Sequence, residues 1–187
     1  MERTLRSLCS RAAFGVWLLF PPLICPSAIA SDADVVPFFR EDCEVAALRA
    51  IRKSRKTIIV AAYSLTSNYV VTALIEAKGR GVDVKMKIDR HQSEQRGAPK
   101  LIGRLRRAGI SVHTVAQPSP YSMHNKFLVV DGDTVLTGSY NFSIAAARGN
   151  WENFVRIRST RIADTFTREW EGLRTRRKVN GKRLDQR

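Results

Sequence analysis

The chain has 187 residues, and 32 Lys and Arg against 17 Asp and Glu give it a formal net charge of +15 at pH 7. With 44% hydrophobic residues it is large enough for a sizeable core, and its length is typical of one domain. Two of the three cysteines lie within the first 30 residues, and Cys43 is the third. A domain beginning after residue 30 therefore cannot depend on an intramolecular disulfide.

The first 30 residues have the three parts of a secretory signal peptide. Residues 1–11 include three Arg, residues 12–20 are mostly apolar, and residues 27–30 are small or apolar, so we expect cleavage after residue 30. The apolar run is short for a membrane span and ends at Pro21-Pro22, which makes an uncleaved anchor the less favoured alternative. Cleavage would remove three Arg and one Glu and lower the net charge from +15 to +13. We therefore expect a periplasmic or secreted protein.

The rest of the chain alternates between strand-like and helix-like segments. Short apolar or alternating runs predict strands at residues 35–39, 58–62, 82–88, 111–116, 127–130, 134–136 and 154–157. Apolar residues at helical spacing predict helices at residues 41–54, 68–78 (capped by Asn68), 100–108, 142–147 and 162–173. The polar segment 91–99 has no periodicity and predicts a loop, and the basic segment 174–187 predicts a frayed end. Together these elements predict an α/β fold with a sheet between helical layers.

The most informative stretch runs from residue 122 to residue 141 and reads as strand, tight turn, strand. His124 and Lys126 are two residues apart on the first strand, so we expect their side chains on the same face. Ser139 and Asn141 have the same spacing after the turn at residues 131–133. A closed hairpin would then carry an imidazole, an ammonium, a hydroxyl and a carboxamide on one surface.

These four groups are suited to binding and attacking a phosphodiester. Lys126 supplies a positive charge for a phosphate oxygen, and Ser139 and Asn141 supply neutral hydrogen bonds. His124 is the one group of the four that can act as a nucleophile or carry a proton near neutral pH. No Asp, Glu, His or Cys cluster with metal-ligand spacing surrounds them in the sequence, so we predict no metal and no other cofactor. If His124 and Lys126 were only surface residues of a strand, the sequence would not need the further polar residues at fixed spacing up to Asn141.

At these residues the sequence resembles the phospholipase D superfamily. His124, Lys126 and Asp131 match its HxKxxxxD motif, and residues 138–141 match the GSxN continuation. Residues 150–153 are similar to the later acidic element, which contains Glu152. The resemblance extends to residues 61–65, 80–84 and 88–89, and it is greatest with the small, single-motif, EDTA-resistant bacterial endonucleases. It implies a phospholipase D-like sandwich, in which a mixed β-sheet is flanked by helices on both faces.

The resemblance also implies a two-step reaction through a phosphohistidine. One His attacks phosphorus, a second His protonates the leaving oxygen, and water then releases the product. Neither His91 nor His113 begins a second HxK, so the second imidazole has to come from His124 of another copy in a homodimer with a composite active site. Glu152 is expected to orient the imidazole, and Asp131 is expected to have a supporting role in catalysis. On this basis residues 1–30 are a signal peptide, residues 31–178 the catalytic domain and residues 179–187 a basic tail.

The positive charge indicates a polyanionic substrate. Clusters of basic residues occur at 52–56, 100–107 and 174–178. They favour a nucleic acid as the substrate, with DNA as the first expectation and RNA as a further one. Few aromatic residues lie among these clusters, so base stacking is predicted to be minor and sequence selectivity low. Two alternatives stay open. One is a phospholipase D or a cardiolipin-type lipid phosphodiesterase, since anionic headgroups attract the same charges. The other is a nucleic-acid-binding module without catalysis, which the intact motif disfavours.

Overall fold

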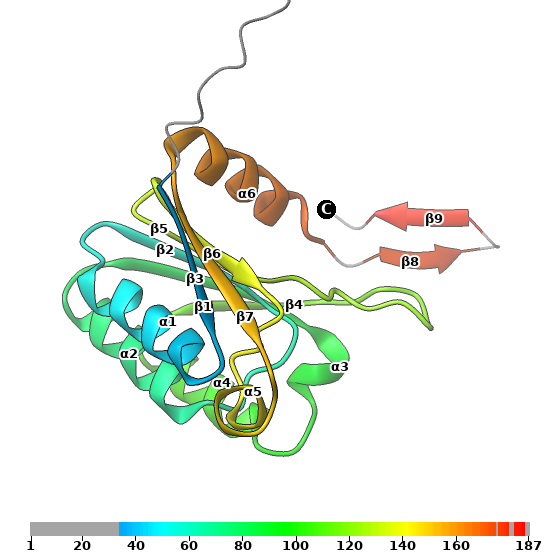
Figure 1. Ribbon diagram of the computed structural model, residues 1–187. Helices are drawn as coiled ribbons and strands as arrows, with labels where there is room; N and C mark the ends of the chain where they lie inside the picture. The colour runs from blue at the N-terminus through cyan, green and yellow to red at the C-terminus, as the bar shows by residue number, and fades with distance from the viewer. Residues whose placement is uncertain (1–33, 175, 180–181, 186–187) are drawn as a thin grey trace, which may run out of the picture. The chain divides into compact units, whose positions relative to one another are not determined.

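The computed structural model describes residues 34–174, 176–179 and 182–185 of the chain (Figure 1). Its centre is a seven-stranded mixed sheet with the strand order β1-β7-β6-β5-β2-β3-β4. The strands are β1 (Asp34–Phe39), β2 (Thr57–Ala62), β3 (Asp83–Asp89), β4 (Ser111–Val115), β5 (Lys126–Val130), β6 (Thr134–Gly138) and β7 (Asn153–Arg158). Strands β2, β3 and β4 are parallel, and the pairs β2–β5, β5–β6, β6–β7 and β7–β1 are antiparallel.

Helices cover both faces of this sheet. They are α1 (Glu41–Lys53), α2 (Asn68–Gly79), α3 (Arg90–Ser93), α4 (Ala98–Arg107), α5 (Ile144–Arg148) and α6 (Thr160–Gly172). In Figure 1, α1, α2, α4 and α5 lie against one face and α6 lies against the other. The predicted α/β sandwich with a mixed sheet between helices is thereby confirmed. No helix in the described part of the chain has the length and apolar character needed to cross a membrane.

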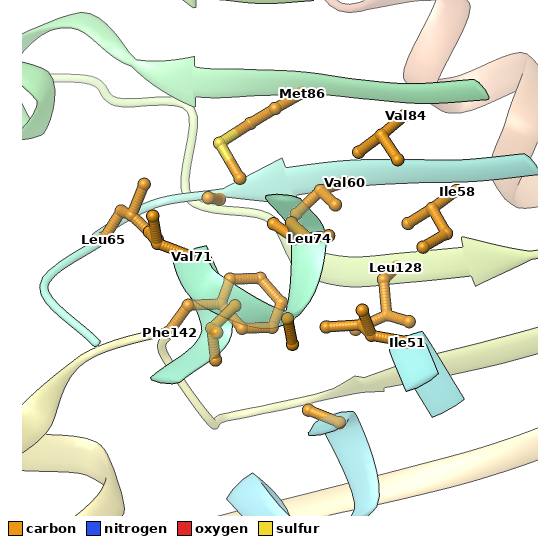
Figure 2. Close-up of a cluster of buried hydrophobic side chains, with 14 of the residues drawn as sticks. Ile51, Ile58, Val60, Leu65, Val71, Leu74, Val84, Met86, Leu128 and Phe142 are labelled. Carbon is orange, nitrogen blue, oxygen red and sulfur yellow. The ribbon is translucent and has the colours of Figure 1, made fainter. Parts of the chain in front are cut away.

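Strand β2 shows why the two layers form. Ile58 and Val60 point into the larger core cluster, where they pack with Leu128 and with side chains of the first helical layer (Figure 2). Ala61 points to the opposite face, where the smaller cluster contains Trp170 of α6. The Trp170 Nε1 atom donates a hydrogen bond of 2.8 Å to the Val60 carbonyl oxygen. A strand covered on both faces needs apolar residues at every position, as its sequence predicted.

The structure corrects several predicted elements. The segment predicted as a loop contains helix α3 and the start of α4, because the Asp89 side chain caps α3 by accepting from Gln92 N. The cap of α2 is Ser67, whose side chain accepts from Val70 N, and Asn68 is already helical. The segment expected to fray forms a hairpin of β8 (Arg176–Val179) and β9 (Lys182–Asp185), so the predicted boundary at residue 178 falls inside a strand. The predicted signal peptide lies outside the described residues.

The topology brings the ends of four strands to one edge of the sheet. Strands β2, β3 and β6 end there with Ala62, Asp89 and Gly138, and β5 begins there with Lys126, which pairs with Ala62. The antiparallel pairing places the turn after β5, at residues 131–133, at the opposite edge. The segments that follow or precede these strand ends therefore meet at the first edge.

Candidate active site

His124 and Lys126 lie together at this edge. Lys126 is the first residue of β5 and is 8% exposed, whereas His124 is exposed and precedes the strand, not within it as predicted. The Lys126 Nζ atom donates to the His124 carbonyl oxygen at 2.9 Å and lies 3.2 Å from the His124 Nδ1 atom. The ammonium and the imidazole therefore form one unit that can contact the same phosphate group.

Tyr63, which the sequence interpretation did not place in the site, joins these two side chains. Its ring centroid lies 4.2 Å from the His124 ring centroid, with an angle of 60° between the planes. The Lys126 Nζ atom lies 4.8 Å from the same tyrosine centroid. Tyr63 directly follows β2, and its hydroxyl oxygen accepts a hydrogen bond of 3.2 Å from Gln92 Nε2. An aromatic residue just after a buried strand was the available signal.

Asp89 fixes the segment that carries His124. This carboxylate is 3% exposed; Oδ1 accepts from Gln92 N and Oδ2 from Met123 N, both at 3.0 Å. One side chain therefore caps α3 and holds the residue before His124. Because Gln92 also contacts Tyr63, these bonds restrain the imidazole and its aromatic neighbour together.

Ser139 and Glu152 form a second group. The Ser139 hydroxyl donates to Glu152 Oε2 and accepts from Asn153 N at 3.0 Å. The other carboxylate oxygen, Oε1, accepts from Asn150 Nδ2 at 3.0 Å. Glycine precedes Ser139 because a Cβ atom at Gly138 would overlap the Asn153 carbonyl oxygen. The close approach of β6 and β7 thus sets the position of the hydroxyl.

Glu152 was expected to orient the imidazole of His124, but its contacts in the structure are with other residues. Its carboxylate is engaged by Ser139 and Asn150, and no hydrogen bond among the described residues joins it to the His124 ring. It lies near enough to Lys126 for its negative charge to favour the charged ammonium. Glu152 therefore positions Ser139 and balances Lys126 in this structure.

Asn141 completes the predicted set. The Oδ1 atom of its carboxamide is buried, and no group in the described residues donates a hydrogen bond to it. Buried polar atoms without a partner are uncommon and need an explanation such as contact with a ligand or water. The unpaired atom is an acceptor, so it would be satisfied by a water or another donor, whereas a phosphate oxygen would have to contact the amide N–H₂ group of Asn141.

The pKa values of the two central residues are both displaced downward. Although His124 is exposed overall, it is partly shielded from water, and this partial burial lowers its pKa; the charge of Lys126 lowers the pKa further, against an opposing effect of Asp89. Burial also lowers the pKa of Lys126, with Glu152 acting in the opposite direction. A lowered pKa keeps the imidazole neutral at pH 7, which is the form that attacks phosphorus.

Asp131 lies away from the other motif residues. Five residues of β5 separate it from the Lys126 end, a distance of roughly 16 Å along a strand. Its carboxylate accepts from the backbone N–H groups of Arg55, Lys56 and Thr57 at 2.7–3.2 Å. Burial raises the pKa of Asp131, but these N–H groups outweigh burial and hold the pKa below its ordinary value. The structure thus gives Asp131 a role in tying β5 to the α1–β2 connection and not in contacting substrate.

Other titratable groups do not extend the site. His91 lies in α3 beside Gln95, and His113 lies on β4 beside Ser111; no hydrogen bond in the described part of the chain joins either to His124. Nor do three or more His, Cys, Asp or Glu side chains come together to hold a metal ion anywhere in residues 34–174. In the described part of the chain, this edge of the sheet therefore carries one imidazole, that of His124.

Comparison with known proteins identifies the family of this chain. The family model described as "Cardiolipin synthase, PLD-like domain" matches residues 47–174, which include all six predicted site residues. A phospholipase D of Rickettsia typhi is 30% identical over 128 residues, covering 68% of this chain and 61% of that protein. The mitochondrial cardiolipin hydrolase of Xenopus laevis is 34% identical over 120 residues, covering 64% and 55%. The matched region spans about three fifths of the length of these relatives.

A solved structure gives the same result for the fold. Nuc from Salmonella typhimurium, described as a phospholipase D family member, superposes with a TM-score of 0.71 and 33% sequence identity. The superposition covers 76% of this chain and 94% of Nuc. The match in sequence and in fold confirms the resemblance found at the motif: this chain belongs to the phospholipase D superfamily.

Proposed function

We propose that this phosphodiesterase is a metal-independent, weakly specific endonuclease that works as a homodimer. The paired His124 and Lys126 carry the proposal, because a neutral imidazole and an ammonium 3.2 Å apart can attack and hold one phosphate group. Two relatives named for cleaving phosphodiesters, a phospholipase D and a cardiolipin hydrolase, support hydrolysis as the reaction. The positive net charge of the chain supports nucleic acid as the substrate. The presence of a single imidazole at the site, that of His124, supports the dimer.

In the proposed reaction a His124 ring nitrogen attacks phosphorus and forms a P–N bond, while the bond from phosphorus to the leaving oxygen breaks. The leaving oxygen takes a proton from His124 of the partner subunit, so the two identical imidazoles must share one extra proton, with the attacking ring neutral and the other in the imidazolium form. That imidazole then removes a proton from water, which attacks phosphorus, breaks the P–N bond and frees His124. Lys126 and the amide N–H₂ group of Asn141 offset the negative charge on the phosphate oxygens during both steps, and Ser139 joins them when its hydroxyl turns from Glu152 to the phosphate.

Basic side chains of the domain support a polyanionic substrate. Lys100, Arg106 and Arg107 of α4 are exposed, and Arg104 is tied to Asn68 and Thr72 of α2. Without the predicted signal peptide the chain has a net charge of +13. A charge of this sign raises the local concentration of nucleic acid and makes its binding dependent on salt.

A lipid substrate is the second candidate, and the names of the relatives favour it. The Rickettsia typhi protein is a phospholipase D and the Xenopus laevis protein a cardiolipin hydrolase. Both headgroup esters and nucleic acids present a phosphodiester, so the four site residues fit either. The choice between a lipid and a nucleic acid therefore depends on the surface outside the site.

The test compares plasmid DNA with vesicles of phosphatidylcholine and cardiolipin, with EDTA present throughout. We expect DNA nicking by the wild type and a loss of about 10³-fold or more in His124→Asn, which should remain folded by circular dichroism. Headgroup release with intact DNA would replace the nuclease by the lipid enzyme. Full nicking by the folded His124→Asn variant would overturn the chemistry itself.

A further inference from the structure

Trp151 is the most exposed large hydrophobic side chain in the described part of the chain, at 83%. It stands between two residues of the site: Asn150 donates to the Glu152 carboxylate, and Glu152 holds Ser139. A single exposed apolar side chain needs no explanation on its own. Its position beside the catalytic groups, and the contacts of its neighbour Arg40, are what make it informative.

Arg40 holds the indole in place. Its guanidinium carbon lies 3.9 Å from the Trp151 ring centroid, and its backbone N–H donates to the Glu152 carbonyl oxygen at 3.0 Å. Arg40 also has φ = 53°, a conformation that L-residues other than Asn, Asp and His rarely adopt. Backbone strain of this kind persists where surrounding contacts enforce it, often at functional sites. The Arg40 guanidinium thus lies over one face of the Trp151 ring, and most of the tryptophan side chain stays exposed to solvent.

An open groove of about 630 Å³ runs along this surface toward Glu152. Trp151 and Arg40 line it together with Phe39, which is 61% exposed. Three carboxylates, those of Glu41, Asp42 and Glu152, also line it. The groove therefore combines flat aromatic surface with one cation and with acceptors of hydrogen bonds.

We propose that this groove binds an unpaired nucleobase, stacked on Trp151, of a nucleic acid strand whose phosphodiester lies at His124. The inference rests on the proposed nuclease function and adds a preference for single strands. Stacking on an aromatic side chain needs a free π-face, and bases in a duplex are stacked on one another. The carboxylates can accept from the amino groups of bases. A quaternary ammonium headgroup fits less well, because Arg40 already places a positive charge against the same ring.

Binding in a His124→Asn background tests this subsite without turnover. The probes are a fluorescently labelled single-stranded DNA oligonucleotide, the same strand annealed to its complement, and a strand of equal length with abasic sites. Trp151→Ala should weaken single-strand binding about tenfold, and Trp151→Phe should restore most of it. Neither the duplex nor the abasic strand should be affected by the substitution. Tyr69→Ala is the matched control, since Tyr69 is 56% exposed and has an arginine neighbour, Arg148, but does not line the groove.

Three results would overturn the proposal. An equal loss for the single strand, the duplex and the abasic strand would mean that Trp151 supports general binding or folding. Conversion of a dimer to a monomer by Trp151→Ala, seen by light scattering, would assign the side chain to the subunit interface. Weaker binding to phosphatidylcholine vesicles with unchanged DNA binding would assign the groove to a headgroup. Because binding is measured, a wild type that cleaves no DNA would refute the endonuclease while this comparison still decides the subsite.

Discussion

Tyr63 gives a physical reason why His124, the proposed nucleophile, is neutral. Its ring packs against His124 and lies beside the Lys126 ammonium, so it removes water from both groups. Burial is the main cause of the lowered pKa of each residue. A neutral imidazole beside a charged ammonium is what attack on a phosphodiester requires, and an aromatic neighbour favours the neutral imidazole without adding a charge of its own.

The pH dependence of kcat/KM tests this role. The acidic limb should lie below pH 6.5, the ordinary pKa of histidine, because protonation of His124 is disfavoured. Tyr63→Ala would hydrate the ring, so the limb should move up toward 6.5, whereas Tyr63→Phe keeps the aromatic contact and should leave it near the wild-type position. An unchanged limb in a folded Tyr63→Ala variant would show that the tyrosine does not set the pKa of His124.

The residues that the sequence could identify are those in the motif. The spacing of His124 and Lys126 predicted that they share a face, and the structure brings them together. The sequence could not identify Tyr63 and Asp89 as contacts of the site, because β2, β3 and β5 meet only in the folded sheet. Trp151 and Arg40 were missed for the same reason, since more than a hundred residues separate them. Asp131 was expected to support catalysis, and its contacts with the α1–β2 connection could not be predicted, because sequence spacing does not show which end of β5 carries the site.

At the level of elements, the two ends of β5 have different roles. Its first residue is Lys126 in the site, and the turn after its last residue carries Asp131, which binds the α1–β2 connection. Strand β5 also pairs with β2 along its length, so both of its ends are fixed to one neighbour. The motif thus spans one strand, with Lys126 of the candidate site at its start and Asp131, which binds the α1–β2 connection, just after its end.

Asp131→Ala should therefore reduce stability more than chemistry. Three backbone N–H groups would lose a charged acceptor, which we expect to lower the free energy of unfolding by about 1–3 kcal/mol in urea denaturation. Because the pKa of Asp131 is lowered by folding, the charged carboxylate stabilises the protein fully above pH 3.8, and this contribution is lost as the pH falls through the folded-state value. The difference between the wild type and Asp131→Asn should shrink over the same range. A large fall in kcat per folded molecule would instead restore a catalytic role for Asp131.

The predictability of the elements depended on their apolar content. β2 was predictable because both of its faces are buried, and α1, α2 and α4 because their apolar residues repeat at helical spacing. Helix α3 was missed because four polar residues show no period, and only the tertiary position of Asp89 makes the cap effective. The β8–β9 hairpin was missed because its basic sequence lacks the usual alternation. Strand order, including β1 beside β7, depends on contacts that no local pattern contains.

For the whole molecule, the central constraint on the proposed reaction is that only one of the three histidines of the chain, His124, lies at the site in the described residues. A reaction that needs an attacking and a protonating histidine requires two copies of His124, and a twofold axis would bring them together. The two sites at such an axis would then be a single composite site. The proposed dimer would make activity depend on association, which a monomeric enzyme would not show.

Mixing experiments test this dependence. Specific activity should fall when the protein is diluted below its dimer dissociation constant, in step with the mass from light scattering. Excess His124→Asn protein added to a fixed amount of wild type should suppress activity severalfold, because mixed dimers contain only one imidazole. An unrelated basic protein at the same concentration controls for competition for DNA. Constant specific activity from a monomer, with no suppression, would exclude the composite site.

The most direct test of the account is to trap the covalent intermediate. The wild type would be denatured during turnover of a DNA oligonucleotide in EDTA, digested under alkaline conditions that preserve phosphohistidine, and examined by mass spectrometry. We predict a nucleotide adduct on the peptide that contains His124, absent from His124→Asn. Turnover with no adduct at His124, or an adduct on His91 or His113 instead, would contradict the proposed mechanism.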